Sequence, residues 1–206
     1  MPKWIYPAIF SFAALIASLI VYNNLPDVMA IHFDPSGEAD NFVSKPLGAF
    51  LAPLLIWIVF IMMSVSMKLE PDENKRQRAE AINLRVMAIV GALLLAAHLF
   101  TLAYNLGHEL NAVKFAAVAI GLVFVLIGNL VPRMGAVQNK WKWPKLPEKA
   151  HRRFAQFQGR LMFGAGFVFI LLTPLPYAIL SPVFFALLIL YVLIHFGSMF
   201  YFSRLR

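Results

Sequence analysis

Four titratable side chains that could hold a metal ion lie close together in a polar segment between two long apolar runs: His32, Asp34, Glu38 and Asp40. One imidazole with several carboxylates is an acceptable ligand set for zinc or manganese. The residues also have a structural interpretation, in which Asp34 and Asp40 cap turns while His32 packs against a helix end. The residues alone favour this structural interpretation over a metal site.

The segment around these residues predicts a small β-hairpin. Ile31-His32-Phe33 alternates apolar and polar residues as a short strand does. Asp34-Pro35-Ser36-Gly37 then has the residues of a tight turn, with Asp first, Pro fixing φ at the second position and Gly last. Residues 38–42 would return as the partner strand. We therefore expect loop 25–47 to display its polar residues on a two-stranded hairpin.

The composition of the chain predicts a membrane protein. The chain has 206 residues, of which 61% are hydrophobic and only 14% are charged. Soluble domains are roughly 45–50% apolar and about 25% charged. The excess falls in stretches of roughly 20 residues with almost no charge, which fits a bilayer core about 30 Å thick. We expect an all-α polytopic membrane protein.

Hydropathy predicts six transmembrane helices. The fifth contains Thr173-Pro174, and each proline there removes a backbone donor. That helix therefore either kinks or ends early, with residues 175–182 forming a re-entrant turn. A short turn is expected at Ser181-Pro182. The predicted spans lie near residues 4–24, 48–67, 86–105, 113–131, 161–180 and 183–202.

The distribution of basic residues predicts the orientation of these spans. Of the 18 lysines and arginines, only Lys45 and Lys114 fall on the side of the membrane opposite the N-terminus. By the positive-inside rule both termini are cytoplasmic and loop 25–47 lies outside. The positive-inside rule then accounts for the net charge of +8, because the basic residues lie in loops on the cytoplasmic side. Direct binding of nucleic acid is therefore not expected. The chain has no cysteine, which excludes disulfides and thiolate chemistry.

The predicted inner loop, residues 132–160, carries a surface of basic and aromatic residues. Cations on lipid phosphate, with tryptophan rings at headgroup depth, would anchor this loop to the membrane. A docking surface for a cytoplasmic partner would use the same residue types. Anchoring is favoured because it needs no partner. The residues concerned are Lys140, Trp141, Trp143, Arg152 and Arg153.

Two sets of polar residues fall inside predicted spans. His98, Thr101 and Asn105 share one face of the third helix, and His195 and Ser198 form a similar pair on the sixth. They could form a proton relay or hydrogen-bond to neighbouring helices, and the second interpretation is favoured. No Asp or Glu falls within a predicted span, which argues against a proton- or sodium-coupled transporter. Because no catalytic motif is recognisable, we expect no enzyme.

Three stretches resemble the SdpI family of membrane proteins. Loop 25–47 is similar to the amino-terminal domain of unknown function of that family, and the end of span four to a second family signature. The third stretch, residues 152–161, resembles that family's lead into the fifth span. Residues 138–145 depart from the family, because its usual inner Gly-Ile-Arg-Thr-Pro-Trp-Thr-Leu-like run is missing. The first resemblance rests on Leu25, Pro26, Asp27, His32, Phe33, Gly37, Asp40 and Lys45, and the second on Gly128, Asn129, Pro132 and Arg133.

The resemblance implies an immunity protein of the bacterial cytoplasmic membrane that protects against a membrane-active peptide toxin. It also implies a possible cytoplasmic regulator as a second partner, a two-span unit over residues 1–67 and a four-span unit over residues 68–206. The loop residues would form or brace the recognition surface, and the span-four residues would shape the inner end of that helix. No cofactor is predicted. The alternative is a metal-dependent membrane enzyme or small-solute permease with a divalent metal at the loop.

Overall fold

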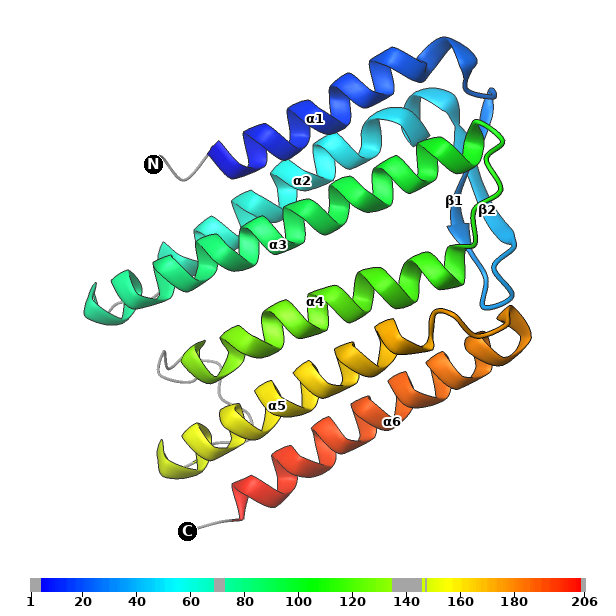
Figure 1. Cartoon of the computed structure of the whole chain (residues 1–206). Helices are drawn as coiled ribbons and strands as arrows, with labels where there is room; N and C mark the ends of the chain where they lie inside the picture. The colour runs from blue at the N-terminus through cyan, green and yellow to red at the C-terminus, as the bar shows by residue number, and fades with distance from the viewer. Residues whose placement is uncertain (1–4, 69–72, 135–145, 147, 205–206) are drawn as a thin grey trace. The chain divides into compact units, whose positions relative to one another are not determined.

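The computed structural model describes residues 5–68, 73–134, 146 and 148–204 (Figure 1). In this part of the chain, the six helices long and apolar enough to cross a membrane confirm the predicted architecture. A two-stranded antiparallel sheet lies between the first two, as expected. The elements are α1 (Ile5–Val21), η1 (Tyr22–Asn24), β1 (Val28–Phe33), β2 (Ala39–Ser44), α2 (Lys45–Lys68), α3 (Glu73–Asn105), α4 (Ala112–Met134), α5 (Glu148–Leu172) and α6 (Tyr177–Ser203).

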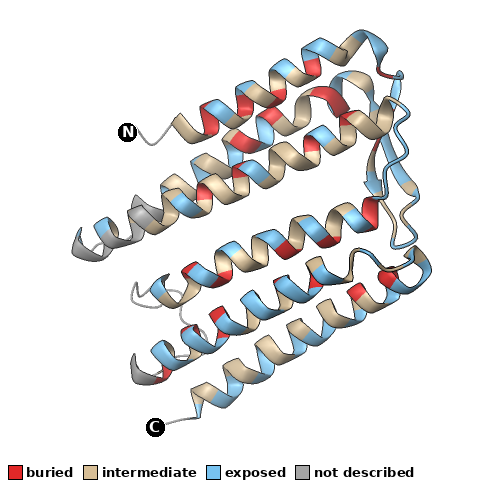
Figure 2. Ribbon diagram, viewed as in Figure 1, coloured by how far each residue is buried: buried red, intermediate tan, exposed pale blue. Residues whose placement is uncertain are grey.

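Figure 2 shows how buried and exposed residues alternate along the helices. On α1 the large apolar side chains are exposed and small residues are buried, whereas α5 and α6 also bury large side chains, Phe169 and Phe184. On α1 the small residues Ser11, Ala14 and Ser18 are buried, at the three- and four-residue spacing of one helix face. This arrangement suits a bilayer, where lipid covers large side chains and small residues let helices approach closely. The large exposed side chains of α1 are Ile9, Phe12, Ile16 and Leu19.

The chain forms two compact units. The first comprises Met1–Ser66 with Leu84–Phe115, and so contains the hairpin, α1, most of α2 and most of α3. The second comprises Met67–Asn83 with Ala116–Arg206 and contains most of α4, with α5 and α6. The units 1–67 and 68–206 inferred from the family resemblance stay a prediction.

Hydrogen bonds across the first unit compensate for a proline inside α2. Pro53 has no N–H, so the carbonyl of Ala49, four residues earlier, lacks its helical donor. Ser18 Oγ of α1 donates to that carbonyl at 2.6 Å. His98 Nε2 of α3 lies 2.8 Å from the same hydroxyl oxygen, and we assign the proton to Nε2 because the hydroxyl proton goes to Ala49. The Ser18 hydroxyl therefore joins three helices, and His98 makes the interhelical bond that its sequence position favoured.

We expect Ser18→Ala to lower the free energy of unfolding by about 1–3 kcal/mol, because it leaves a buried carbonyl without a donor. In a Pro53→Ala background the new N–H at position 53 satisfies Ala49, so the same substitution should cost less. Denaturant unfolding of the four proteins of this double-mutant cycle in detergent measures the difference. An equal cost in both backgrounds would show that Ser18 does not compensate for the proline.

Glycines let α4 and α5 approach closely in the second unit. A Cβ atom at Gly128 would lie 2.7 Å from Phe163 N, and one at Gly159 would lie 2.7 Å from Gly128 O. Two helical turns away, a Cβ at Gly166 would lie 2.5 Å from Gly121 O. These distances leave no room for a side chain. The glycines therefore serve close helix packing, as their small size predicted.

We expect Gly159→Ala to destabilise the protein by about 1–3 kcal/mol, because the new methyl group would overlap backbone atoms of α4. Gly164→Ala on the same helix is the matched control. A Cβ at Gly164 has no neighbour within 4 Å, so alanine should be neutral or stabilise the helix by up to about 1 kcal/mol. Denaturant unfolding in detergent compares the two, and equal effects would contradict the close approach.

The predicted boundary between the last two spans, 161–180 and 183–202, is wrong, but the alternative that the fifth helix ends early at its prolines is confirmed. The prolines end α5 at Leu172 instead of kinking it, and Thr173–Pro176 form a turn in which Leu175 N–H donates to Leu172 O. Residues 175–182 form no re-entrant turn, because α6 begins at Tyr177, directly after Pro176. Proline costs little there, since the first helical N–H groups have no partner inside the helix.

Other predicted turns and loops also prove helical. Ser181-Pro182 lies inside α6, one turn beyond its start, where a single missing hydrogen bond is tolerated. α5 begins at Glu148, inside the loop predicted over residues 132–160. α3 begins at Glu73, whose negative charge stabilises the helix start through the helix dipole.

Candidate functional site

Asp27 and Lys45 close the open end of the hairpin. Lys45 N–H donates to Asp27 O at 2.8 Å, and the lysine ammonium lies 3.7 Å from the Asp27 carboxylate. The same ammonium sits 5.4 Å from the centre of the Tyr22 ring, a cation–π distance. Both residues belong to the segment that resembles the SdpI family, and here they fix where β1 begins and where α2 starts.

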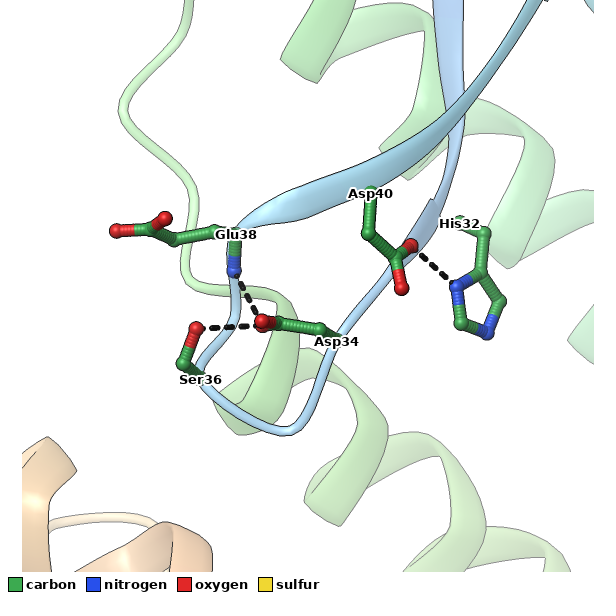
Figure 3. A network of polar contacts seen from close by, with 5 residues as sticks. All are labelled: His32, Asp34, Ser36, Glu38 and Asp40. Carbon is green, nitrogen blue, oxygen red and sulfur yellow. Dashed lines mark hydrogen bonds and ion pairs between the residues drawn. The ribbon is translucent and has the colours of Figure 1, made fainter.

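The turn of the hairpin is built on Asp34. Gly37 N–H donates to Asp34 O at 2.8 Å, with Gly37 at φ 78°, a conformation that glycine adopts without strain. The Asp34 carboxylate accepts hydrogen bonds from Ser36 Oγ at 2.6 Å and from Glu38 N–H at 3.0 Å (Figure 3). The Ser36 hydroxyl, helped by these N–H groups, holds the pKa of Asp34 below its ordinary 3.8. Asp34 thus shapes the turn, as its structural interpretation predicted.

His32 and Asp40 form a pair across the two strands, so the structural interpretation is wrong for these two residues: His32 does not pack against a helix end, and Asp40 lies within β2 and does not cap a turn. His32 Nδ1 lies 2.5 Å from Asp40 Oδ1, and the two side chains are 65% and 45% exposed. Figure 3 shows the Glu38 carboxylate pointing away from this pair. The hairpin therefore brings together only two of the four candidate metal ligands. Among the described residues, no three His, Asp or Glu side chains are placed to hold one ion.

The side chain of Asn105, the last residue of α3, holds the hairpin in place. Its Oδ1 accepts a hydrogen bond from Ala30 N–H at 2.8 Å, and its Nδ2 donates to Ala30 O at 2.9 Å. The Nδ2 group also donates to Thr101 O at 2.8 Å. One amide thus satisfies both backbone groups of a β1 residue, as a neighbouring strand would. The sequence had indicated only a polar residue near the end of a span.

The docked face of the hairpin, Met29 and Phe33, packs against the helices of the first unit. Met29 is fully buried, and a Cβ atom at Gly48 would lie 2.9 Å from its sulfur. The Phe33 ring meets Tyr104 and Phe100 edge-on, with ring centres 4.6 and 5.6 Å apart. This packing and the Asn105 bonds attach the hairpin to α3.

The exposed face of the hairpin consists of Val28, His32, Asp40 and Phe42. Val28 is 60% exposed and Phe42 is 53% exposed. The sequence had not singled out Phe42, although its place two residues after Asp40 on a strand puts both side chains on one face. The hairpin thus combines an exposed acidic and imidazole pair with two exposed apolar side chains.

The span-four motif has a packing part and an exposed part. Gly128 and Pro132 both contact Gly159 of α5. Asn129 and Arg133 are exposed. On α5, Arg152 and Arg153 are also exposed, as the predicted basic surface requires. The remaining members of that surface, Lys140, Trp141 and Trp143, lie outside the described residues.

The second pair of polar membrane residues joins α6 to α5. His195 Nδ1 donates to Gln158 Oε1 at 2.8 Å, and Gln158 Nε2 donates to Ser198 Oγ at 2.6 Å. The favoured interpretation, hydrogen bonding between helices, therefore fits this pair. Gln158 itself went unnoticed in the sequence, where a single glutamine on a basic segment carries little signal.

The comparison with protein families finds one match. Residues 9–57 match DUF1648, a domain of unknown function. This domain is found in SdpI-like membrane proteins. The matched range covers most of α1, the whole hairpin and the first half of α2, which is where the sequence resembled the amino-terminal domain of that family. No curated protein and no solved structure matches the chain.

We expect Asn105→Ala to speed hydrogen exchange at the Ala30 amide by at least about tenfold, because the substitution removes both hydrogen bonds to that residue. Thr101→Ala is the matched control, since the Thr101 hydroxyl bonds only to Ala97 O of its own helix. Exchange measured by mass spectrometry on peptides spanning β1 reads the effect. Unchanged protection in Asn105→Ala, or equal loss in the control, would contradict the role of Asn105.

Proposed function

We propose that this chain is an SdpI-type membrane protein that protects a bacterial cell against a membrane-active peptide toxin. Its hairpin would be the recognition element. The match of residues 9–57 to a domain found in SdpI-like membrane proteins supports the proposal. The observation that carries it is the convergence of the motif residues on one docked hairpin.

Some of the motif residues hold the hairpin together, and others lie on its exposed face. Asp27 and Lys45 close one end, Gly37 closes the other, and Phe33 docks the sheet on α3. His32 and Asp40 remain on the exposed face. A surface held in its binding geometry before the ligand arrives loses less entropy on binding. The arrangement therefore suits recognition, and the proposal assigns no catalytic step.

The proposal includes an orientation in the bacterial cytoplasmic membrane. Of the 18 lysines and arginines, 16 fall on the side that holds both termini, which favours a cytoplasmic location for that side. The hairpin then faces the outside, where a secreted peptide would arrive. Arg133, Arg152 and Arg153 then face the cytoplasm, where they would meet anionic lipid or a regulator. No specific observation favours a metal-dependent enzyme or a permease.

The experiment is survival of a sensitive bacterium that expresses the protein and is challenged with membrane-active peptides. We expect the wild type to raise the inhibitory concentration of at least one peptide, and His32→Ala/Asp40→Ala to abolish that protection. Both residues lie on the exposed face, so the membrane abundance of the variant, measured by immunoblot, should stay unchanged.

The matched control is His108→Ala/Glu109→Ala, which likewise removes one histidine and one carboxylate, from the exposed loop between α3 and α4. This control should protect as the wild type does. A wild type that protects against no peptide would overturn the proposal. An equal loss of abundance and protection in His32→Ala/Asp40→Ala would show that these residues serve folding.

A further inference from the structure

Within the described chain, the hairpin is a two-stranded sheet, so each strand has one edge without a partner strand. On β1 that edge is occupied at Ala30 by the Asn105 amide. On β2 no further strand is present, and residues 40–42 are exposed. An unpaired strand edge presents backbone donors and acceptors to an incoming chain.

The register tells which β2 groups face this free edge. In an antiparallel pair, hydrogen-bonded and non-hydrogen-bonded residue pairs alternate. The bond from Lys45 N–H to Asp27 O makes that pair a hydrogen-bonded one, and three residues further along each strand Ala30 pairs with Phe42. Phe42 therefore turns its N–H and C=O away from β1. Ala30, its partner, does the same and meets Asn105, which supports the assignment.

The side chains beside the free edge are apolar and acidic. The ring of Phe42 is 53% exposed. Asp40, two residues earlier on the same face, is 45% exposed, and one of its oxygens pairs with His32. Loop 25–47 holds four carboxylates and a single lysine, and that lysine is paired with Asp27. The loop is thus negatively charged in a chain of net charge +8. Such a surface attracts cations and repels the anionic lipids of a bacterial membrane.

We propose that the free edge of β2 binds a cationic peptide in extended conformation, which adds to the sheet as a third strand. Backbone hydrogen bonds to Phe42 would supply affinity, and side chains at alternate positions would meet the Phe42 ring and the Asp40 carboxylate. This inference rests on the proposed function and deepens it, because it names the class of peptide and how the hairpin holds it. A lipid surface is the competing occupant, which the negative charge disfavours.

The probe is a synthetic eight-residue peptide of alternating lysine and valine, labelled with a fluorophore. Binding is measured by fluorescence anisotropy to the full chain in phosphatidylcholine nanodiscs, beside empty nanodiscs. A second peptide of the same sequence is N-methylated at every residue, which keeps the charge but removes the backbone donors. We expect the methylated peptide to bind on the order of tenfold more weakly, the effect of losing about two net hydrogen bonds.

Substitutions in β2 test the same edge from the protein side. Phe42→Pro removes an N–H that points away from β1, so it spares the ladder between the strands. Phe42→Ala keeps that N–H and removes only the ring. We expect Phe42→Pro to weaken binding more than Phe42→Ala. Hydrogen exchange at the Ala30 amide checks that the hairpin stays docked in both variants. If Phe42→Pro unfolds the hairpin, the comparison of the two peptides on the wild-type protein still tests the inference.

Equal affinity for the methylated and unmethylated peptides would overturn the inference, because charge alone would then explain binding. Equal binding to empty nanodiscs would also overturn it, in favour of a lipid surface. Protection of cells without edge-dependent binding would leave the proposed function standing and remove this inference. Edge-dependent binding without protection of cells would leave this inference standing and remove the proposed function.

Discussion

Backbone polar groups inside the hydrocarbon core of a bilayer must find partners within the protein, and backbone groups buried elsewhere need them too. In the first unit, two side chains meet this constraint at places where regular secondary structure leaves a backbone group unpaired. Ser18 donates to the carbonyl that Pro53 leaves free in α2. Asn105 pairs with both backbone groups of Ala30 on the open edge of β1. The first bond joins two helices, and the second attaches the hairpin to a third.

This constraint explains why the hairpin can be both exposed and held in place. A two-stranded hairpin alone is marginally stable in water. Here Asn105 takes the place of a third strand, Phe33 and Met29 dock one face, and the Asp34 turn closes the tip. The opposite face needs no packing, so it can carry His32, Asp40 and Phe42 toward a ligand.

The second unit is held together by close packing of helix backbones, whereas in the first unit side chains hydrogen-bond to unpaired backbone groups. Gly128 and Gly159 allow α4 and α5 to approach to backbone contact. One buried glutamine, Gln158, then ties α5 to α6 through His195 and Ser198. Neither contact uses an Asp, Glu, Lys or Arg side chain, so α5 and α6 are joined here without a carboxylate, an ammonium or a guanidinium group.

The sequence by itself determined the six spans, the hairpin between the first two and the turn at Asp34. These are local signals: long apolar runs, period-two alternation, and the backbone preferences of Pro and Gly. Only the tertiary structure decided that His32 pairs with Asp40, that Asn105 holds Ala30, and that Ser18 compensates for Pro53. It also decided that Pro174 ends α5 while Pro182 lies within α6. The reason is that a hydrogen bond between residues 31 or 75 positions apart leaves no local pattern, and a proline's effect depends on whether another helix supplies the missing partner.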